Sequence, residues 1–321
     1  MEEKSNYFEV DAISNSSIVR FMDSPSLYYM EALKAPKRHF DLGSAIDCMI
    51  TESNRFDELI EVADYKKPGP STKGGKLVES LIISNKEGKE WDESLDIAIE
   101  VADYASKTKE KILEEFEVYR KYYESITGGS GKIILTYKEL KLCKEIVKNL
   151  TIDQRCSKWF TSDEDGEVEF QKEIYWDCLG LACKSKLDVV KVNHKAKEVY
   201  ITDIKTMSGY TFDFIKSILF RKYWMQGSFY TTAMTTLEGY DDYKFSFRFV
   251  VESTTNPGRP MCYKLSKEDI LMGAMGGKIE GKWYKGFKEI LHDIKWHKEN
   301  NLWDYSREYY ENECVETKIC E

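Results

Sequence analysis

The sequence predicts a mixed α/β (α+β) fold, in which a central mixed sheet is flanked by helices and the N-terminal half is helical. Three observations support this class. Helical periodicity dominates the chain up to about residue 165. Three short segments rich in β-branched and aromatic residues then follow one another. Beyond them, helical patterns lie on both sides of one further alternating segment.

In the N-terminal half, Ser14 or Ser16 caps a first predicted helix, and Pro25 begins a second. Residues 42–53 place apolar side chains on one helical face, and the segments 91–124 and 136–150 are helical in pattern. Two prolines and three glycines predict a mobile loop at 66–76. The glycine-rich stretch TGGSGK (127–132) lacks the spacing of a phosphate-binding loop and is interpreted as a connector.

The sheet is predicted from three consecutive strands at 167–176, 181–192 and 198–207, forming a meander. A helix follows at 212–237, with a break near Phe220–Arg221, and a fourth strand follows at 244–253. Ser266 begins a long helix, with Asp269 in a partial capping box. The tail 300–321 is an interaction segment or a frayed end. We treat all 321 residues as one domain, with a helical region at 1–165, a sheet region at 166–265 and a C-terminal region at 266–321.

Composition indicates a globular protein, with 42% apolar and 32% charged residues. No run of eighteen apolar residues occurs and the N-terminus MEEKSNYFEV is acidic, so we expect neither a membrane span nor a secretory signal, and a cytoplasmic location. The eight cysteines form no CxxC pair and are interpreted as buried thiols.

The net charge of −9 at first argues against a nucleic-acid partner. However, the segments 34–39, 66–76 and 184–197 are basic, whereas the acidic excess lies in 87–100, 163–169 and 308–321. A positive channel within an acidic protein suits an enzyme that must release a polyanionic product. Lys184 and Lys186 are candidates to follow a DNA backbone, and Arg221 and Arg38 to anchor phosphates, although solvated positions explain such residues equally well.

Two carboxylates and an ammonium group are the chemical signal of the sheet. If 183–192 and 198–206 pair across the turn NHKAK, Asp188 lies on the strand adjacent to Asp203 and Lys205, which share one face. Two acids can hold a hard cation such as Mg²⁺, and a lysine can stabilise charge on a phosphoryl group. The alternative is a solvated hairpin with incidental charges. The apolar context ITDIKTM favours the metal site, because a charge within an apolar strand is costly unless it is paired.

Five segments together resemble one protein family. They are NSSIVRFMDSPSLYYM, HFDLGSAIDCMITESNRFDE, CKSKLD, DIKT and WMQGSFY, whose order and spacing over about residues 10–265 are similar to those of PD-(D/E)XK nucleases. The branch is that of the RecE-like, phage-type exonucleases related to the RecB nuclease domain. The resemblance implies a restriction-endonuclease-like core.

The resemblance also implies roles for individual residues. Asp188 and Asp203 become metal ligands with the main-chain carbonyl of Ile204, and Lys205 becomes the catalytic lysine. Gln226 and Tyr230 face the site from the following helix, where Gln226 positions Lys205, the attacking water or a phosphate.

Three further positions near the implied metal site are compared with the family pattern. Asp47 stands where the family has a histidine, either as a third ligand suited to Mg²⁺ or as a sign of a degenerate site. Leu187 replaces the proline before the first acid. Glu173 matches an acid on the preceding strand, although Glu169 competes for that role.

The function implied is a Mg²⁺-dependent deoxyribonuclease, with Mn²⁺ as an alternative ion, acting as a 5′-to-3′ exonuclease on double-stranded DNA ends. It would serve phage or prophage recombination in a bacterial or phage-infected cell, beside a single-strand annealing protein, as a homo-oligomeric trimer or tetramer ring. Two alternatives stay open: a non-catalytic DNA-end binding scaffold with a decayed site, and a structure-specific or restriction-like endonuclease. No iron–sulfur cluster is expected, because only Cys314 and Cys320 lie late in the chain and Cys262 is distant.

Overall fold

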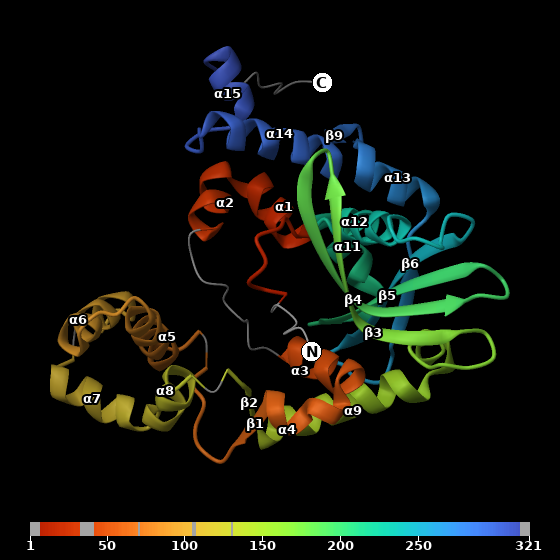
Figure 1. Ribbon diagram of the computed structural model, residues 1–321. Helices are drawn as coiled ribbons and strands as arrows, with labels where there is room; N and C mark the ends of the chain where they lie inside the picture. Colours follow the sequence, from red (N-terminus) through yellow and green to blue (C-terminus); the bar gives the residue numbers. More distant parts are fainter. Residues whose placement is uncertain (1–6, 33–41, 70, 105–106, 130, 315–321) are drawn as a thin grey trace, which may run out of the picture. The chain divides into compact units, whose positions relative to one another are not determined.

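A computed structural model describes residues 7–32, 42–69, 71–104, 107–129 and 131–314 (Figure 1). The chain divides into two compact units. We call Met1–Lys37 with Lys148–Glu321 the sheet unit, and Arg38–Val147 the helical unit. The sequence instead suggests one domain with an internal division near 165. The first helices belong with the sheet because their apolar residues Ile18 and Phe21 are buried in its core.

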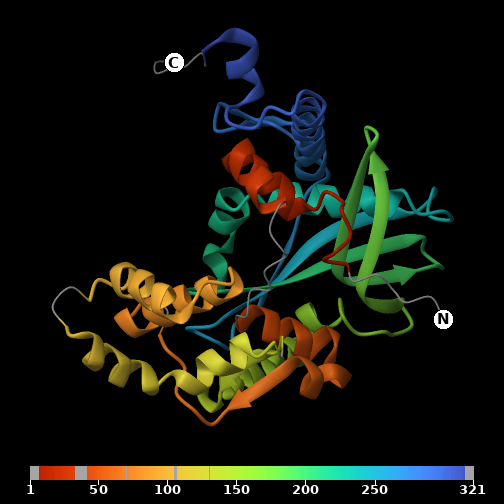
Figure 2. The same ribbon diagram turned by 60° about the vertical axis from the view of Figure 1, so that its left-hand side comes forward.

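The sheet unit contains a five-stranded mixed sheet in the order β3-β4-β5-β6-β7. The parallel pair is β5–β6 and the other three pairs are antiparallel. The strands are β3 (Glu167–Cys178), β4 (Leu181–Asn193), β5 (Glu198–Met207), β6 (Lys244–Ser253) and β7 (Met261–Lys264). The predicted mixed sheet flanked by helices, with a meander of three strands, is confirmed. β3 and β4 form a long twisted hairpin, drawn in green in Figure 2. The four-residue β7 is too short to give a sequence signal.

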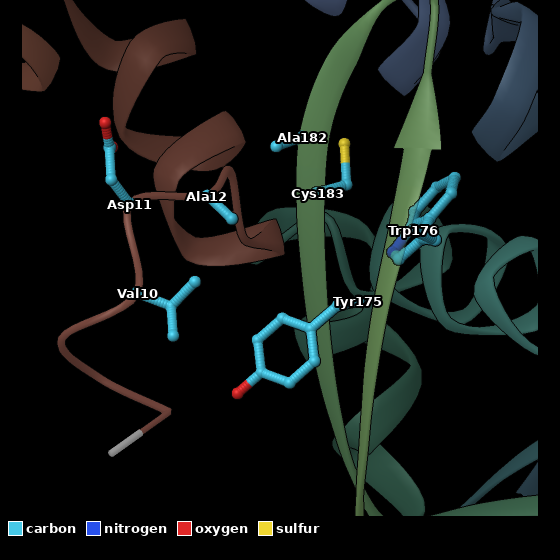
Figure 3. A pocket seen from close by; sticks show the side chains of 7 residues that line it. All are labelled: Val10, Asp11, Ala12, Tyr175, Trp176, Ala182 and Cys183. Carbon is cyan, nitrogen blue, oxygen red and sulfur yellow. The ribbon is translucent and has the colours of Figure 1, made fainter. Parts of the chain in front are cut away.

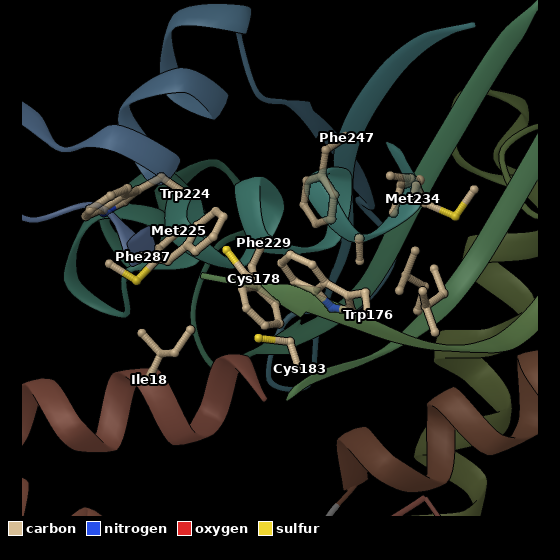
Figure 4. Close-up of a cluster of buried hydrophobic side chains, with 14 of the residues drawn as sticks. Ile18, Trp176, Cys178, Cys183, Trp224, Met225, Phe229, Met234, Phe247 and Phe287 are labelled. Atoms are coloured by element: carbon tan, nitrogen blue, oxygen red, sulfur yellow. The ribbon is translucent and has the colours of Figure 1, made fainter. Parts of the chain in front are cut away.

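Helices cover the sheet through an aromatic core. α11 (Phe214–Phe220) and α12 (Tyr223–Thr235) are separated by Lys222 in a left-handed conformation (φ 57°), which confirms the predicted break. The buried residues of α12 pack with Trp176 of β3 and Phe247 of β6 (Figure 4). Gly227 permits this close approach, since a Cβ atom there would lie 2.5 Å from Cδ1 of Leu265.

The remaining helices of this unit lie before and after the sheet. They are α1 (Asn15–Asp23), α2 (Pro25–Ala32), α10 (Gln154–Ser157), α13 (Lys267–Met275), α14 (Phe287–Asn300) and α15 (Arg307–Asn312), with the 3-10 turn η2 (Thr211–Asp213). Ser266 and Asp269 form the predicted capping box. The single long helix expected after Ser266 is wrong, because the chain turns at Gly276 (φ 83°). A hairpin, β8 (Gly277–Ile279) with β9 (Lys282–Tyr284), then separates α13 from α14.

The helical unit has its own core, built from buried residues of α5, α6 and α7, against which the half-buried Tyr122 and Tyr123 of α8 pack. Its elements are α3 (Leu42–Thr51), η1 (Ser53–Arg55), α4 (Phe56–Leu59), β1 (Ile60–Ala63), α5 (Lys73–Lys86), α6 (Trp91–Val101), α7 (Lys109–Glu117), α8 (Arg120–Thr127), β2 (Ile133–Thr136) and α9 (Tyr137–Ile152), which runs on into the sheet unit. The short parallel pair β1–β2 is not foreseen by the sequence.

The mobile loop predicted at 66–76 needs correction at its end. Residues 73–76 form the first turn of α5, because the hydroxyl of Thr72 caps that helix by accepting a hydrogen bond from the backbone N–H of Gly75. The cysteines in the described residues are free thiols, and five of the seven are buried. Among the helices in the described ranges of the chain, none is long and apolar enough to cross a membrane.

Candidate active site

Two neighbouring strands separate where the predicted acids lie. β4 and β5 pair from Asn193↔Glu198, next to the turn, to Val189↔Thr202, where the ladder ends. One residue further on, Oδ2 of Asp188 accepts a hydrogen bond of 2.9 Å from the backbone N–H of Ile204. The carboxylate of Asp188 therefore takes the place of a strand partner and lies beside the centre of the DIK triplet.

The second acid and the lysine form a close pair on β5. Nζ of Lys205 lies 2.5 Å from Oδ2 of Asp203, whose side chain is 3% exposed. Ile204 points to the opposite face and is buried, as strand alternation predicts. Burial raises the pKa of Asp203, an effect that Lys205 and Gln226 oppose. Burial would lower the pKa of Lys205, but the negative charges of Asp203 and Asp188 outweigh it and hold that pKa above its ordinary value.

Helix α12 completes this cluster with two side chains one turn apart. Nε2 of Gln226 donates a hydrogen bond of 2.7 Å to Oδ1 of Asp203. Gln226 thus orients the acid, whereas the sequence suggests a contact with the lysine, a water or a phosphate. The pKa of Tyr230, which lies one turn after Gln226, is raised first by burial and then by the nearby charges of Asp203, Tyr7 and Asp188. The phenol therefore stays protonated and can donate a hydrogen bond.

Two aromatic residues at this site were missed by sequence reasoning. The ammonium group of Lys205 lies 5.1 Å from the ring centroid of Tyr223, a cation–π contact that helps to hold it. Tyr7 of the N-terminal segment is close enough to Tyr230 to raise its pKa. Neither had a sequence signal, because Tyr223 follows a helix break and Tyr7 precedes every predicted element.

Lys184 explains how the N-terminal segment reaches the site. Its Nζ donates hydrogen bonds of 2.9 and 2.7 Å to the carbonyl oxygens of Tyr7 and Val10. Next to it, Ile13 forms a parallel bridge with Cys183. Lys184 is buried, and burial lowers its pKa. The structure therefore gives Lys184 a role in fixing the N-terminal segment to β4, in place of the exposed DNA contact that the sequence suggests.

Replacing Lys184 by methionine is expected to lower the free energy of unfolding by about 1–3 kcal/mol, because two main-chain carbonyls lose their donor. Urea unfolding followed by circular dichroism measures the loss. Lys186→Met is the matched control. Nζ of Lys186 makes two long contacts, 3.9 Å to Oε1 of Glu173 and 5.8 Å to the ring centroid of Phe8, so this substitution should change stability by less than about 0.5 kcal/mol. Equal losses in both variants would contradict the assigned role.

A hollow of about 330 Å³ lies between this N-terminal segment and the β3–β4 hairpin (Figure 3). Its walls are Val10, Asp11, Ala12, Tyr175, Trp176, Ala182 and Cys183. None of these residues belongs to the cluster around Asp203 and Lys205, and the lining is mostly apolar. The hollow is a packing feature beside the N-terminal segment and is separate from the candidate site.

The remaining predicted residues are placed as follows. Glu173 lies opposite Lys186 in the β3–β4 register and accepts a hydrogen bond of 3.3 Å from the hydroxyl of Tyr175, so it pairs with neighbours on its own hairpin. Arg221 is exposed at the break between α11 and α12. Asp47 lies on α3 of the helical unit, half-buried. Arg38 lies outside the described residues.

The donor atoms of the cluster are those that a hard cation prefers. Asp188, Asp203 and the carbonyl of Ile204 offer oxygen ligands alone, the set suited to Mg²⁺ or Mn²⁺. In the described ranges, no group of three or more His, Cys, Asp or Glu side chains could hold a metal ion. Within the sheet unit, Asp188, Asp203 and the carbonyl of Ile204 are the groups that would hold such an ion.

Comparisons with known proteins give structural likenesses alone. No family model and no curated protein matches the chain. Among solved structures, it is similar to a Eubacterium rectale protein named "putative exonuclease", at 14% identity and a TM-score of 0.49, covering 100% of this chain and 97% of that one. It is also similar to the protein SSO0001 (TM-score 0.24, 14% identity, 58% and 67% covered) and to protein VC1899 from Vibrio cholerae (0.22, 14%, 80% and 55%). All three TM-scores are below 0.5, so these likenesses do not bear on the function of the chain.

Proposed function

We propose that the chain is a metal-dependent nuclease of the PD-(D/E)XK type that hydrolyses phosphodiester bonds in DNA. The observation that carries the proposal is the ion pair of Asp203 and Lys205, held by Gln226 and with Asp188 one strand away. A buried ion pair is weak evidence for stability, because desolvation offsets the attraction between its charges. Two carboxylates and a protonated amine where the β4–β5 ladder ends are better explained by chemistry on a phosphate group.

Each residue of the candidate site would have its own role in phosphodiester hydrolysis. Asp188, Asp203 and the carbonyl of Ile204 would hold Mg²⁺, which supplies Lewis acidity and lowers the pKa of a bound water. Gln226 fixes the carboxylate of Asp203 in one orientation. Lys205 stays protonated beside two acids and offers its N–H groups to phosphoryl oxygens as negative charge develops. Tyr230, also protonated, is a second donor on the helix side of the site.

The finer assignment extends the resemblance found in the sequence. We propose a 5′-to-3′ exonuclease on double-stranded DNA ends that acts in phage or prophage recombination with a single-strand annealing protein. A homo-oligomeric ring would gather basic segments around a central channel. This arrangement would also reconcile DNA binding with the net charge of −9.

Digestion of linear duplex DNA tests the proposal. With Mg²⁺ the full chain is expected to release nucleotides from the ends, and EDTA is expected to stop the release until Mg²⁺ is added again. A covalently closed circle of the same sequence should stay intact, and its cleavage would instead indicate an endonuclease. Release of nucleotides that continues unchanged in EDTA would contradict metal dependence.

A second candidate is a DNA-end binding scaffold with a decayed site. The observation that favours it is the small set of candidate metal ligands: within the sheet unit, Asp188 and Asp203 supply two carboxylates. Calorimetric titration with Mg²⁺ and Mn²⁺ separates the two functions. The nuclease should bind at least one ion, with binding weakened in Asp188→Asn, whereas a decayed site should give no heat of binding with either ion.

A further inference from the structure

A group of exposed apolar side chains follows β5 directly. Tyr210 is 53% exposed, Phe212 61% and Phe220 88%, and Ile215 and Leu219 of α11 are also exposed. We call the first two the ring pair. Large apolar side chains that lie together in solvent usually mark a binding surface. The opposite face of α11 is anchored by the buried residues Phe214 and Ile218, so the exposed side is the one left available.

The ring pair is held in a defined geometry. The rings of Tyr210 and Phe212 are stacked, with centroids 5.2 Å apart and planes 10° from parallel. Hydrogen bonds on both sides fix the backbone beneath them. The hydroxyl of Thr211 donates to the carbonyl of Arg259 (2.7 Å), and the hydroxyl of Tyr263 donates to the carbonyl of Thr211 (2.7 Å). This surface is therefore pre-organised, with flat apolar faces open to solvent.

The charge around the ring pair favours a polyanion. Residues 208–222 carry three cations, Lys216, Arg221 and Lys222, against one acid, Asp213. Lys216 pairs with Asp213 and Lys222 with Asp23, so Arg221 supplies the excess charge of this segment. Arg259, whose carbonyl accepts the hydrogen bond from Thr211, is a further exposed cation on the adjoining segment. This local excess of positive charge contrasts with the net charge of −9 for the chain. Parallel rings among cations suit unpaired nucleotides, whose bases stack on the rings while their phosphates meet the cations.

We propose that the ring pair of Tyr210 and Phe212 is a stacking platform for unpaired bases of a DNA strand. The inference rests on the proposed nuclease function, because the strand stacked here would be the one whose backbone reaches Lys205. Tyr210 follows Lys205 by five residues, so their Cα atoms are separated by at most about 18 Å. The substrate class is thus a DNA end with a single-stranded stretch, in which frayed bases lie on the rings.

Binding to two probes tests the platform without any cleavage. Fluorescence anisotropy in EDTA compares a labelled 12-nucleotide oligothymidylate with an abasic oligonucleotide of the same length and charge, using the full chain. The parent protein is expected to bind the oligothymidylate about tenfold more tightly. The double variant Tyr210→Ala/Phe212→Ala should lose this preference but keep the affinity for the abasic probe, which measures phosphate contacts alone.

A matched control uses a second pair of exposed aromatic residues, Tyr305 and Tyr309, whose ring centroids are 4.7 Å apart. Tyr305→Ala/Tyr309→Ala should leave both affinities unchanged. The proposal is overturned if the parent shows no preference for bases, or if Tyr210→Ala/Phe212→Ala retains it. It is also overturned if light scattering shows that this variant loses an oligomer while its DNA binding is intact, since the rings would then join chains. Because no metal is present, a failure of the nuclease proposal would be seen separately, in the digestion of linear DNA.

Discussion

Replacing Asp203 by asparagine is expected to slow DNA cleavage by about three orders of magnitude. Asparagine keeps the oxygen that accepts the hydrogen bond from Gln226, so the local structure should survive. The change removes the negative charge that holds a cation and pairs with Lys205. A cation contributes several kcal/mol to transition-state stabilisation, and about 4 kcal/mol corresponds to a thousandfold change in rate. Initial rates of nucleotide release from linear duplex DNA measure the effect.

A second Asp–Lys ion pair in the sheet unit serves as a control. It shows how much the loss of any such ion pair changes the rate of cleavage. Nζ of Lys216 on α11 lies 2.6 Å from Oδ1 of Asp213, the last residue of η2, and the ammonium side of this pair is exposed to solvent. Asp213→Asn should therefore leave the rate within about a factor of two, because an exposed pair contributes little. Each variant is purified in the same way, so a contaminating nuclease would give equal rates in all preparations. Equal rates for Asp203→Asn and Asp213→Asn would remove Asp203 from the reaction.

Much of the sheet could be predicted because its signals are local. The strands around Asp188 and Asp203 consist of β-branched residues bounded by a polar turn, and this pattern specifies both the strands and their antiparallel pairing. Alternation then places Asp203 and Lys205 on one face and Ile204 on the other. The break before α12 was also visible as a change in pattern near Phe220–Arg221.

The contacts that the sequence did not reveal join residues far apart in the chain. The sequence pattern suggests that Lys184 is a solvated lysine of a strand. Its Nζ instead donates to two carbonyl oxygens that lie more than 170 residues earlier, in a segment with no regular structure. Gln226 could be placed near the site by its helix, but whether its amide meets Asp203 or Lys205 depends on how α12 packs on the sheet. That packing is set by tertiary contacts that a single sequence does not display.

Replacing Phe229 by alanine is expected to lower the free energy of unfolding of the sheet unit by about 3–5 kcal/mol. Phe229 is fully buried, and its ring lies 4.8 Å from Trp176 and 5.3 Å from Phe287, measured between centroids. Truncation would leave a cavity where β3, α12 and α14 meet, and these elements can close it only incompletely. Urea unfolding followed by tryptophan fluorescence measures the loss, with Trp176 beside the cavity among the reporting side chains.

Phe220→Ala removes the same atoms from a neighbouring position of the chain. Its side chain is 88% exposed, so the substitution removes no buried contact and should change stability by no more than about 0.5 kcal/mol. The difference between the two variants isolates burial from the chemistry of the side chain.

Since Phe229 lies one turn after Gln226 on α12, its loss should also loosen the amide that orients Asp203. Cleavage by Phe229→Ala should then fall even at temperatures where circular dichroism shows the chain folded. Equal stabilities for the two variants would mean that Phe229 does not belong to a closely packed core.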